Sequence, residues 1–470
     1  MRPLYLGRIR LAWCDACHVP VLGGTCGTCG GTTREVPVTP PGDVRPASPA
    51  DRGLVNRVYR DQFGAPLVPD GALALMNKVP DPDRMEEVVV GGAVVGHVRY
   101  LPEKDRWEPI PRIEAGTLLG PSRRFVVADR GAVPSIRDEG ASLLAPGLLE
   151  IEGSVKAGDE VFVLDPDRTV IGVGRARVSA GEARAMTRGA VVRTRRNVSS
   201  PCVPGEATWE DAVAANAAIL EQYEAASAAF VREVSGAHPG LPVAVSFSGG
   251  KDSLATLLVV MRALDRVPPL LFADTGLELP ETYANIDEVA ARYGAEVVRS
   301  RGRGAFDAAF DERGPPSVRD RWCCGVCKLA PIGEAIRSRF GECLAFIGQR
   351  KYESARRARS RRVWRNPSLP VQLSAAPIHG WTALHVWLYL FREGAPYNRL
   401  YEEGLDRIGC YVCPSSDRAV LRMMEERYPD LMDAWNGRLR EWQRERGLPD
   451  EWVTDGQWRR AGKDGAGSGR

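Results

Sequence analysis

The stretch Ser-Phe-Ser-Gly-Gly-Lys-Asp-Ser at residues 246–253 decides the fold of the C-terminal half of this chain. The apolar run at 242–245 before it is typical of a short buried strand. Apolar residues after it recur at helical spacing from 254 to 261, and Asp252 or Ser253 can cap the first turn of that helix. A strand, a tight glycine turn and the start of a helix together predict a phosphate cradle.

This cradle has the chemistry that an anionic phosphate needs. A glycine turn exposes backbone N–H groups, the helix dipole favours an anion at the helix N-terminus, and Lys251 adds a positive point charge. The sequence therefore predicts that residues 246–253 bind an adenine nucleotide.

The composition is that of an ordinary globular protein. The chain has 470 residues, of which 44% are hydrophobic and 26% charged, and this length suggests about two to four domains. No apolar run approaches the roughly 18 residues of a membrane span, and the first residues lack a secretory segment. We therefore expect a cytoplasmic protein without a membrane partner. The net charge of +3 does not by itself indicate nucleic acid, so RNA binding needs a local basic patch.

Patterning divides the chain into segments of different fold. From 121 to 196, short strands alternate with Gly, Asp and Pro turns, as in a small β-barrel. From 241 onward, strands alternate with helices, which predicts a doubly wound parallel sheet that binds its ligand at the carboxyl ends of the strands. We expect a multidomain protein with a zinc ribbon at 8–32, an uncharacterised linker or pre-barrel region at 50–118, a β-barrel domain at 121–196, an α/β domain at 208–455 and a disordered tail at 461–470.

Two cysteine pairs near the N-terminus have the spacing of a metal site. Cys14 and Cys17 form one Cys-x2-Cys knuckle, Cys26 and Cys29 form a second, and glycines supply the tight turns. Four thiolates meet the tetrahedral requirement of structural zinc and leave no open position for catalysis. Two surface disulfides are the alternative, which a reducing compartment disfavours. We therefore expect a structural zinc ion at this site.

A second group of cysteines is split between two distant segments. Its members are Cys323, Cys324, Cys327, Cys410 and Cys413. The knuckles 324/327 and 410/413 suit either zinc or an iron–sulfur cluster, and the spacing alone leaves both open. The extra adjacent Cys323 is unusual for a zinc site, and buried inert cysteines are a further alternative.

Six ordered motifs between about 240 and 415 resemble those of the phosphoadenosine phosphosulfate reductase family, within the PP-loop ATP pyrophosphatases. The motifs are Ser248-Gly249-Gly250-Lys251-Asp252-Ser253; Asp274-Thr275-Gly276 with Glu278, Pro280 and Glu281; Arg321-Trp322-Cys323-Cys324 with Lys328 and Pro331; Gly348-Gln349-Arg350 with Glu353, Ser354 and Arg357; Pro377-Ile378 with Trp381; and Pro396-Tyr397-Asn398 running to Gly409-Cys410. Six motifs in one order are not expected by chance.

The resemblance implies the fold, the cofactors and the site. It implies a sheet like that of the adenine nucleotide alpha hydrolases, ATP with Mg2+, and a 4Fe-4S cluster on four of the five cysteines, as in family members that reduce adenylyl sulfate. Lys251 and Asp252 are expected to be catalytic. The expected nucleotide-binding residues are Ser246, Ser248, Gly249, Gly250, Lys251, Asp252, Ser253, Asp274, Thr275, Gly276, Gly348 and Arg350.

The positions of these motifs agree with that expectation. Residues 274–276 follow one predicted strand and residues 348–350 follow another, where short polar turns can meet a nucleotide. Arg350 or Arg357 could pair with an anionic phosphate or sulfate. For Glu353 and Arg357, an i,i+4 surface pair on a helix is the alternative.

An arginine run follows these motifs. Its six members within ten residues are Arg356, Arg357, Arg359, Arg361, Arg362 and Arg365. A solvated face is the default reading of a charge run, but its place beside a nucleotide pocket suggests a track for a polyanion.

The segment at 121–196 also resembles a PUA domain, the small RNA-binding barrel found on RNA-modifying enzymes. The resemblance rests on residues 140–147, 158–161 and 172–176. The C-terminal edge of the segment is locally basic, with Arg175, Arg177, Arg184, Arg188, Arg193, Arg195 and Arg196. Such a patch would bind RNA backbone in a salt-sensitive way, and an arginine-rich barrel that binds nothing is the alternative. A zinc ribbon, a PUA-like barrel and an adenylating core in one chain, as in archaeal members of the family, fit an enzyme that acts on structured RNA.

Two features point away from sulfate reduction. Sulfonucleotide reductases need a nucleophilic cysteine on a mobile C-terminal segment, and no cysteine follows Cys413. The intact loop at 248–253 suits the β and γ phosphates, which a sulfonucleotide lacks, and enzymes that retain this loop typically split ATP into AMP and pyrophosphate. The lone Cys202 and Cys343 are more often packed residues than nucleophiles.

The leading hypothesis is therefore a PP-loop ATP pyrophosphatase-type sulfurtransferase that modifies RNA. ATP would place its pyrophosphate on residues 248–253, with Thr275 and Gly276 lining the nucleoside end. A tRNA base carbonyl would be adenylated, and sulfur from a donor or reductant would displace AMP. The alternatives are a reductase that releases sulfite from adenylyl or phosphoadenylyl sulfate, and a non-catalytic RNA-binding protein with a structural cluster.

Overall fold

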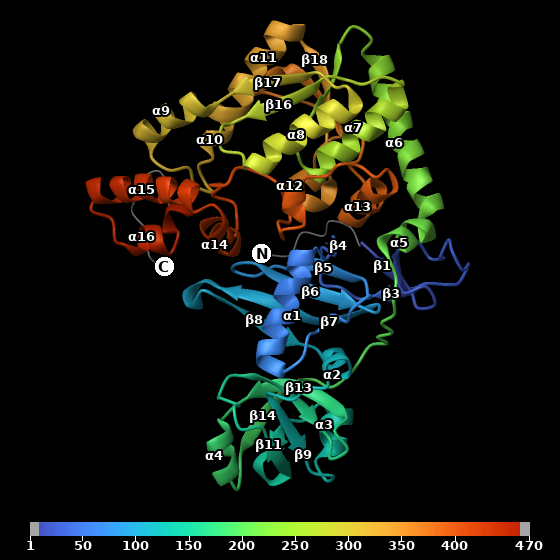
Figure 1. The fold of residues 1–470 in the computed structure, drawn as a ribbon, viewed down its shortest axis with the longest axis vertical. Coiled ribbons are helices and arrows are strands. Elements are labelled where there is room, and N and C mark those ends of the chain that lie inside the picture. The colour runs from blue at the N-terminus through green and yellow to red at the C-terminus, as the bar shows by residue number, and fades with distance from the viewer. Residues whose placement is uncertain (1–8, 461–470) are drawn as a thin grey trace. The chain divides into compact units, whose positions relative to one another are not determined.

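The computed structural model describes residues 9–460, which form two compact units, 9–217 and 218–460 (Figure 1). Each unit has its own sheets and its own apolar cores. The tail expected at 461–470 lies outside the described residues. Within 9–460, no helix is long and apolar enough to cross a membrane.

The N-terminal cysteine module is a small antiparallel sheet with the strand order β2-β1-β3. The strands are β1 Leu11–Cys14, β2 Val19–Val21 and β3 Arg34–Val36. Its second knuckle packs against helix α5 (Trp209–Ala215), where the Gly27 N–H donates to the Ala215 carbonyl oxygen at 2.9 Å. A Cβ at Gly27 would lie 2.8 Å from that oxygen, so this approach requires glycine.

The sequence predicted no fold for the region 50–118. In the structure this region supplies most of a five-stranded antiparallel sheet with the order β4-β5-β6-β7-β8. Its strands are β4 Arg45–Pro46, β5 Ala74–Lys78, β6 Met85–Val90, β7 Ala93–Leu101 and β8 Arg106–Pro111. Helix α1 (Pro49–Phe63) begins at a capping box formed by Ser48 and Asp51, and it ends at Gly64 with φ 95°. A short helix, α2 (Ile113–Leu119), follows the sheet.

The next segment is a six-stranded sheet with the order β10-β14-β13-β12-β9-β11, so the short strands expected over 121–196 are present. The strands are β9 Phe125–Ala128, β10 Leu143–Leu144, β11 Leu148–Ile151, β12 Glu160–Leu164, β13 Val170–Ala176 and β14 Ala190–Arg196. Strand β12 runs parallel to β9, and the other neighbours are antiparallel. Helices α3 (Val133–Glu139) and α4 (Ala180–Ala185) complete this domain.

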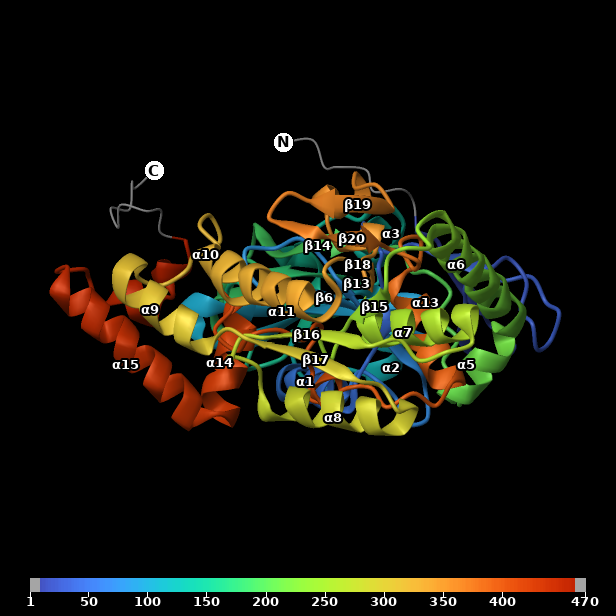
Figure 2. The same cartoon turned by 90° about the horizontal axis from the view of Figure 1, so that it is seen from above.

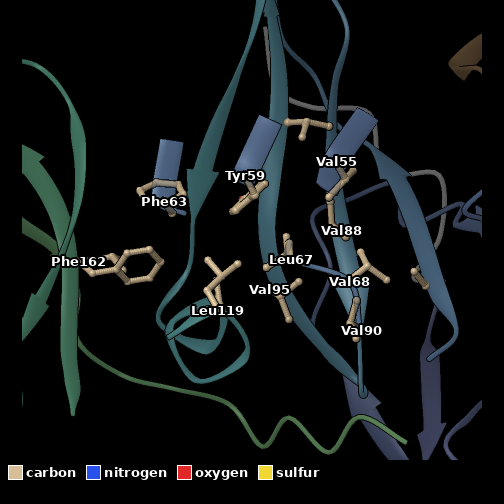
Figure 3. Close-up of a cluster of buried hydrophobic side chains, with 14 of the residues drawn as sticks. Val55, Tyr59, Phe63, Leu67, Val68, Val88, Val90, Val95, Leu119 and Phe162 are labelled. Carbon is tan, nitrogen blue, oxygen red and sulfur yellow. The ribbon is translucent and has the colours of Figure 1, made fainter. Parts of the chain in front are cut away.

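One apolar core joins these two sheets (Figure 3). Tyr59 and Phe63 of α1 meet Phe162 of β12, and the ring centroids of Phe63 and Phe162 are 5.0 Å apart in a T-shaped pair. Successive side chains of a strand point to opposite faces, so Phe162 enters this core while Val161 and Val163 enter the core on the other face. The two sheets are therefore connected by a common apolar core and not only by the chain that links them.

The second unit contains the predicted doubly wound sheet, with the order β17-β16-β15-β18-β20-β19. Its strands are β15 Val243–Ser246, β16 Leu270–Asp274, β17 Val297–Arg301, β18 Cys343–Ile347, β19 Val363–Asn366 and β20 Leu369–Ala375. All neighbours are parallel except the edge strand β19. The chain runs outward from β15 to β17 and then returns to β18 on the other side of β15. This reversal makes the carboxyl ends of β15 and β18 a topological switch point, where open α/β sheets bind their ligands.

Helices surround this sheet and extend past one end of it (Figure 2). Those next to the sheet are α6 Ala217–Ala237, α7 Lys251–Leu264, α8 Pro280–Tyr293, α11 Ala330–Phe340 and α13 Ala383–Arg392. A further group consists of α9 Arg303–Arg313, α14 Arg418–Arg427, α15 Pro429–Glu445 and α16 Glu451–Thr454. This group shares an apolar core around Phe306 and Trp435, in which Cys327 is buried.

Because Phe162 belongs to the core shared by the two sheets of the first unit, we expect truncation of its side chain to destabilise the protein strongly. We expect Phe162→Ala to lower the free energy of unfolding by about 3–5 kcal/mol, because it leaves a cavity beside Phe63. Urea unfolding of the full chain, followed by circular dichroism, measures this change. The matched control is Leu149→Ala in the same domain, where the residue is 61% exposed. Equal midpoints for the two variants would contradict a core shared by the sheets.

Candidate functional site

The predicted phosphate loop lies at the switch point, between the end of β15 and the start of α7. Gly249 has φ +70°, a left-handed conformation that favours glycine, and a Cβ there would lie 3.0 Å from Thr282 Cγ2. Gly250 is the N-cap residue of α7, and no side chain caps the helix. The expectation that Asp252 or Ser253 caps this helix is therefore wrong, because both lie inside its first turn. The dipole of α7 favours an anion at this end, although the Lys251 N–H itself donates to a protein hydroxyl.

Three charged side chains are packed together at the start of α7. Lys251 Nζ lies 2.9 Å from Asp252 Oδ2, and Arg350 Nε donates to Asp252 Oδ1 at 2.6 Å. Burial alone would raise the pKa of the Asp252 carboxyl group, but Arg350 and Lys251 lower this pKa to about 2. Burial lowers the pKa of the Lys251 ammonium group, but Asp252 opposes burial and the net pKa is raised. The triad therefore stays ionised at neutral pH with one net positive charge.

The serines of the loop close its turn. Ser253 Oγ donates to the Gly250 carbonyl oxygen at 2.7 Å and accepts from the Ser248 N–H at 3.3 Å. Ser246 is the last residue of β15. All the nucleotide-binding residues predicted between 246 and 253 thus belong to one hydrogen-bonded loop.

Two residues that follow α13 support the loop from outside. The Lys251 N–H donates to the Tyr401 hydroxyl at 3.0 Å, and Asn398 Nδ2 donates to Thr282 Oγ1 at 3.2 Å. Asn398 belongs to a motif that the sequence identified, but Tyr401 was missed. Tyr401 is 150 positions from its partner, and no local pattern marks it.

The end of β18 packs directly on the first turn of α7 through Gly348. A Cβ at Gly348 would lie 2.5 Å from the carbonyl carbon and oxygen of Asp252 and 2.6 Å from the Ser253 nitrogen, so only glycine permits this contact. Arg350 follows two residues later, is 3% exposed, and reaches Asp252 from this position. The structure therefore brings the predicted residues 348 and 350 to the phosphate loop.

The turn at 274–276 follows β16, the neighbour of β15. Asp274 Oδ1 accepts the N–H of the third residue of this turn at 2.9 Å. Thr275 is 1% exposed, and its hydroxyl donates to Glu278 Oε1 at 2.9 Å and lies 3.6 Å from Cys410 Sγ. Thr275 thus connects the carboxyl edge of the sheet to the second cysteine group.

The second cysteine group comes together from two segments 83 positions apart, Cys327 and Cys410 being the nearest members in sequence. Cys323 and Cys324 lie in a short helix, α10 (Trp322–Cys324), and Cys327 lies in the π-helical segment Gly325–Leu329 that continues it. A hydrogen bond with Cys324, burial and the nearby thiols of Cys410 and Cys413 raise the pKa of Cys323, so the two segments meet.

Cations surround this cysteine group. Arg321 Nη2 donates to Cys324 Sγ at 3.5 Å, and Arg407 Nη2 donates to Cys413 Sγ at 3.6 Å. A hydrogen bond from the neighbouring thiol, together with Arg321 and Lys328, lowers the pKa of Cys324 to about 5 despite burial. Cys324 therefore has thiolate character without any metal, and thiolates are the form that binds metals, whereas the pKa of Cys323, Cys327 and Cys410 is raised.

The N-terminal cysteines form a tighter group. The ligand atoms of Cys14, Cys17, Cys26 and Cys29 all lie within 4.8 Å of one another, a spacing that could hold a metal ion. Cys14 Sγ and Cys29 Sγ are 3.5 Å apart, and Cys26 Sγ and Cys17 Sγ are 3.9 Å apart. Within residues 9–460, no other set of three or more His, Cys, Asp or Glu side chains meets this limit.

Four of the seven arginines of the predicted basic patch lie on β13 and β14, and Arg177, Arg184 and Arg188 lie in the segment between these strands, which includes α4. Arg175 is directly opposite Arg193 in this antiparallel pair, and like charges at such positions repel. Arg175 donates to the Gly158 carbonyl oxygen at 2.8 Å, and Arg195 pairs with Glu160 at 2.7 Å. Arg193 is exposed and has no hydrogen bond or ion pair from its side chain to any residue that the structure describes.

The arginine-rich segment at 356–365 follows closely after Arg350. Arg357 forms an ion pair with Glu353, which is the i,i+4 pair that the sequence left open as an alternative. Arg362 and Arg365 donate to backbone oxygens. The other three, exposed and without a side-chain hydrogen bond or ion pair in the described chain, are Arg356, Arg359 and Arg361.

Fold and site together define a class: a multidomain protein whose α/β domain carries a phosphate loop at the switch point of its sheet. Residues 242–416 match the model of the phosphoadenosine phosphosulfate reductase domain, and residues 124–198 match that of the PUA domain. The chain belongs to the phosphoadenosine phosphosulfate reductase family, an enzyme family, as its motifs predicted.

Similar proteins match either nearly the whole chain or a part of it. An uncharacterized protein from Methanocaldococcus jannaschii is 35% identical over 467 residues, 97% of each chain. An adenosine 5'-phosphosulfate reductase from Bacillus pumilus is 31% identical over 147 residues, 31% of this chain and 61% of that protein. The structure of phosphoadenylyl-sulfate reductase from Candida auris matches with a TM-score of 0.33 and 19% identity, over 41% of this chain and 95% of that one. The full-length similarity thus includes the N-terminal domains, whereas the similarity to the Bacillus pumilus reductase spans about a third of the chain.

The close contact at Gly348 predicts that adding one methyl group at this position destabilises the fold. We expect Gly348→Ala to lower the free energy of unfolding by about 1–3 kcal/mol, because the methyl group would overlap the backbone of Asp252. Gly380→Ala is the matched control, since a Cβ at Gly380 meets nothing within 4 Å. Urea unfolding of both variants measures the difference. If the two variants unfold alike, the close approach of β18 to α7 is incorrect.

Proposed function

We propose that this protein is an ATP-dependent, adenylating RNA-modifying enzyme that transfers sulfur to a tRNA base. One observation carries the proposal: a complete phosphate loop, with Lys251, Asp252 and Arg350 packed against one another, occurs in the same chain as a PUA domain. The loop supports ATP as a substrate, and the PUA domain supports RNA as the acceptor.

ATP with Mg2+ suits the phosphate loop. The dipole at the N-terminus of α7 and the net positive charge of the triad favour the β and γ phosphates, which a sulfonucleotide does not have. Lys251 and Arg350 already contact both carboxylate oxygens of Asp252. Mg2+ would therefore be held largely by the phosphates and by water, as is usual for this ion.

The proposed reaction has two displacements. First, the carbonyl oxygen of a base attacks the α-phosphorus of ATP; a P–O bond forms, the bond to pyrophosphate breaks, and Mg-pyrophosphate leaves. Second, a sulfur nucleophile at the oxidation level of sulfide attacks the carbon of the activated base; a C–S bond forms and the C–O bond breaks with release of AMP. No oxidant or reductant is consumed when the donor is already at that level. Lys251 would stabilise the charge that develops on the phosphates.

The PUA domain would hold the RNA. Arg175 and Arg193 are forced together by the register of β13 and β14, so a phosphate between them would relieve their repulsion. Arg193 is exposed and has no protein partner among residues 9–460, which leaves it available for such a contact. The domain would thus bind RNA backbone in a salt-sensitive way.

The cysteine groups differ in the metal that their geometry suits. The compact group at residues 14, 17, 26 and 29 suits a single zinc ion, because one tetrahedral ion needs all four sulfurs close together. No three sulfurs of the second group meet the same 4.8 Å limit. Wider separation suits a four-iron cluster, in which each thiolate binds a different iron.

Cys327 is the member of the second group that fits a ligand role least. It is 1% exposed in the apolar core around Trp435, whereas the other four cysteines of the group are only partly buried. We therefore assign the cluster to four cysteines, Cys323, Cys324, Cys410 and Cys413, which agrees with the family pattern. A cluster on these residues would supply a site for sulfur chemistry.

Sulfite-releasing reduction of a sulfonucleotide is the second candidate, because several relatives are named adenosine 5'-phosphosulfate reductase. That reaction needs a reactive thiolate outside the cluster. Cys343 is fully buried at the amino end of β18, away from the phosphate loop, and burial raises its pKa to about 12. Burial likewise raises the pKa of Cys202 to about 11. Cys327, which lies outside the proposed four-cysteine cluster, is also buried, and burial raises its pKa to about 12. None of these three residues has the properties of an active nucleophile.

Replacing Lys251 tests the proposed chemistry. We expect Lys251→Met to reduce AMP formation from ATP, bulk tRNA and sulfide by at least about 100-fold, because it removes a charge that stabilises the transition state. Anaerobic incubation, nucleotide chromatography and mass spectrometry of the tRNA nucleosides measure AMP and a sulfur-for-oxygen exchange together. Arg266→Gln, just past the far end of α7, is the matched control and should keep full activity.

The same assay distinguishes the three functions. Wild-type protein that forms no AMP and changes no base contradicts the proposal. Sulfite from adenylyl sulfate and a thiol, without dependence on tRNA, supports the reductase. Binding of tRNA without either reaction supports a non-catalytic RNA-binding protein.

Metal analysis tests both cysteine assignments at once. After anaerobic purification, we expect Cys26→Ser to lose zinc but keep iron and acid-labile sulfide, because it removes one of four zinc ligands. Cys410→Ser should lose iron and sulfide but keep zinc. Cys327→Ser should keep all three, and loss of iron from this variant would contradict the assignment of Cys327 as the unligated thiol.

A further inference from the structure

We infer that residues 349–366 of the α/β domain form a second RNA-binding surface, in which Arg356, Arg359 and Arg361 contact phosphates beside the nucleotide loop. This inference rests on the proposed function, in which RNA is the acceptor. It adds that the catalytic domain itself binds the RNA backbone, independently of the PUA domain.

The segment is held to the domain by side chains and backbone. Gln349 Nε2 donates to Ser360 Oγ at 2.7 Å, and Ser360 Oγ donates to the Arg357 carbonyl oxygen at 2.8 Å. The Lys351 N–H donates to the His379 carbonyl oxygen at 2.9 Å. These bonds tie the arginine run to the residues that directly follow Gly348 at the switch point.

Part of the arginine run serves as an anchor. Arg362 Nη2 donates to the Pro377 carbonyl oxygen at 3.0 Å, and its guanidinium carbon lies 3.7 Å from the centroid of the Phe230 ring. Arg365 Nη2 lies 3.0 Å from Glu342 Oε2. Together with the Arg357 ion pair, these contacts engage three of the six arginines of the run.

The remaining three arginines are not anchored to the domain by their side chains. Arg356, Arg359 and Arg361 are exposed and make no side-chain hydrogen bond or ion pair within the described chain. Three like charges within six residues repel one another, and a polyanion relieves that repulsion. Because the neighbouring contacts already hold the backbone, a ligand would have little ordering cost to overcome.

The surface fits nucleic acid better than an acidic protein. A stable protein interface needs an apolar anchor at its centre, whereas phosphate contacts need only exposed cations. The large apolar side chains that are exposed in residues 9–460 are Leu144, Leu149, Val198, Val203, Val267 and Val318. None of them lies within 349–366, so this surface offers guanidinium groups without an apolar centre.

The surface lies close to the phosphate loop, which suggests how it would act on bound RNA. Its first residues follow Gly348, which contacts the first turn of α7, so a polyanion bound here lies beside the phosphate loop. An RNA strand held by these arginines would place a base at the nucleotide. The PUA domain would then select the RNA, and this surface would deliver its base.

The test compares salt dependence in two triple variants. In the full-length protein without ATP, we expect Arg356→Gln, Arg359→Gln and Arg361→Gln together to reduce the slope of log affinity for bulk tRNA against log salt by about 2, since each phosphate contact to a single strand contributes about 0.7. The affinity loss at 50 mM salt should then exceed the loss at 200 mM by about 20-fold. Filter binding at several salt concentrations measures both.

The control removes the same charge from the opposite edge of the sheet. Arg266, Arg292 and Arg337 lie at or just past the C-terminal ends of α7, α8 and α11, and replacing them with Gln should leave the slope unchanged. Equal slopes for the two triple variants would overturn the inference while leaving the proposed function intact. Wild-type protein that does not bind tRNA would instead overturn the proposed function. Loss of poly-glutamate binding by the first triple variant, with tRNA binding retained, would assign the surface to an acidic protein and also overturn the inference.

Discussion

The contact between Gly348 and the first turn of α7 is the constraint on which the candidate site depends. Strands β15 and β18 are parallel neighbours, so the chain that leaves each strand must occupy the same space at the carboxyl edge. The absence of a side chain at Gly348 lets the two segments meet backbone to backbone. That approach places Arg350 on Asp252 and completes a charge triad with Lys251. Without it, a phosphate loop would remain, but its carboxylate would lose the second of two cations that keep it ionised in a buried place.

The same edge of the sheet also reaches the second cysteine group. Thr275 follows β16 and lies between Glu278 and Cys410, so the loop at 246–253 and the second cysteine group lie along one edge of the sheet. The four sulfurs of the N-terminal group, by contrast, are brought together by two local knuckles in the other unit. This difference in origin agrees with a structural role for the compact group and a chemical role for the one next to the phosphate loop.

Arginine has three different physical roles in this chain. Arg350 is buried and neutralises a carboxylate, Arg362 is an anchor stacked on an aromatic ring, and Arg193 faces solvent opposite another arginine. A count of basic residues cannot separate these roles, because each depends on what lies across from the side chain. The net charge of +3 therefore does not identify a basic surface, whereas the pairing of β13 with β14 shows that Arg175 and Arg193 lie opposite each other.

The sequence by itself determined the elements whose geometry is local. The strand–loop–helix at 243–264, the two knuckles at residues 14–29 and the alternation of strand and helix after 241 all depend on neighbours within a few positions. Only the tertiary structure decided that Gly250, rather than Asp252 or Ser253, is the N-cap residue of α7, and that Tyr401 holds the Lys251 amide. It also decided that residues 45–119 form a sheet with a helix across it. Which arginines are anchored was decided at the same level. The reason is distance along the chain: Arg350 and Asp252 are 98 positions apart, Tyr401 and Lys251 are 150 apart, and no local pattern records a partner that folding alone brings near.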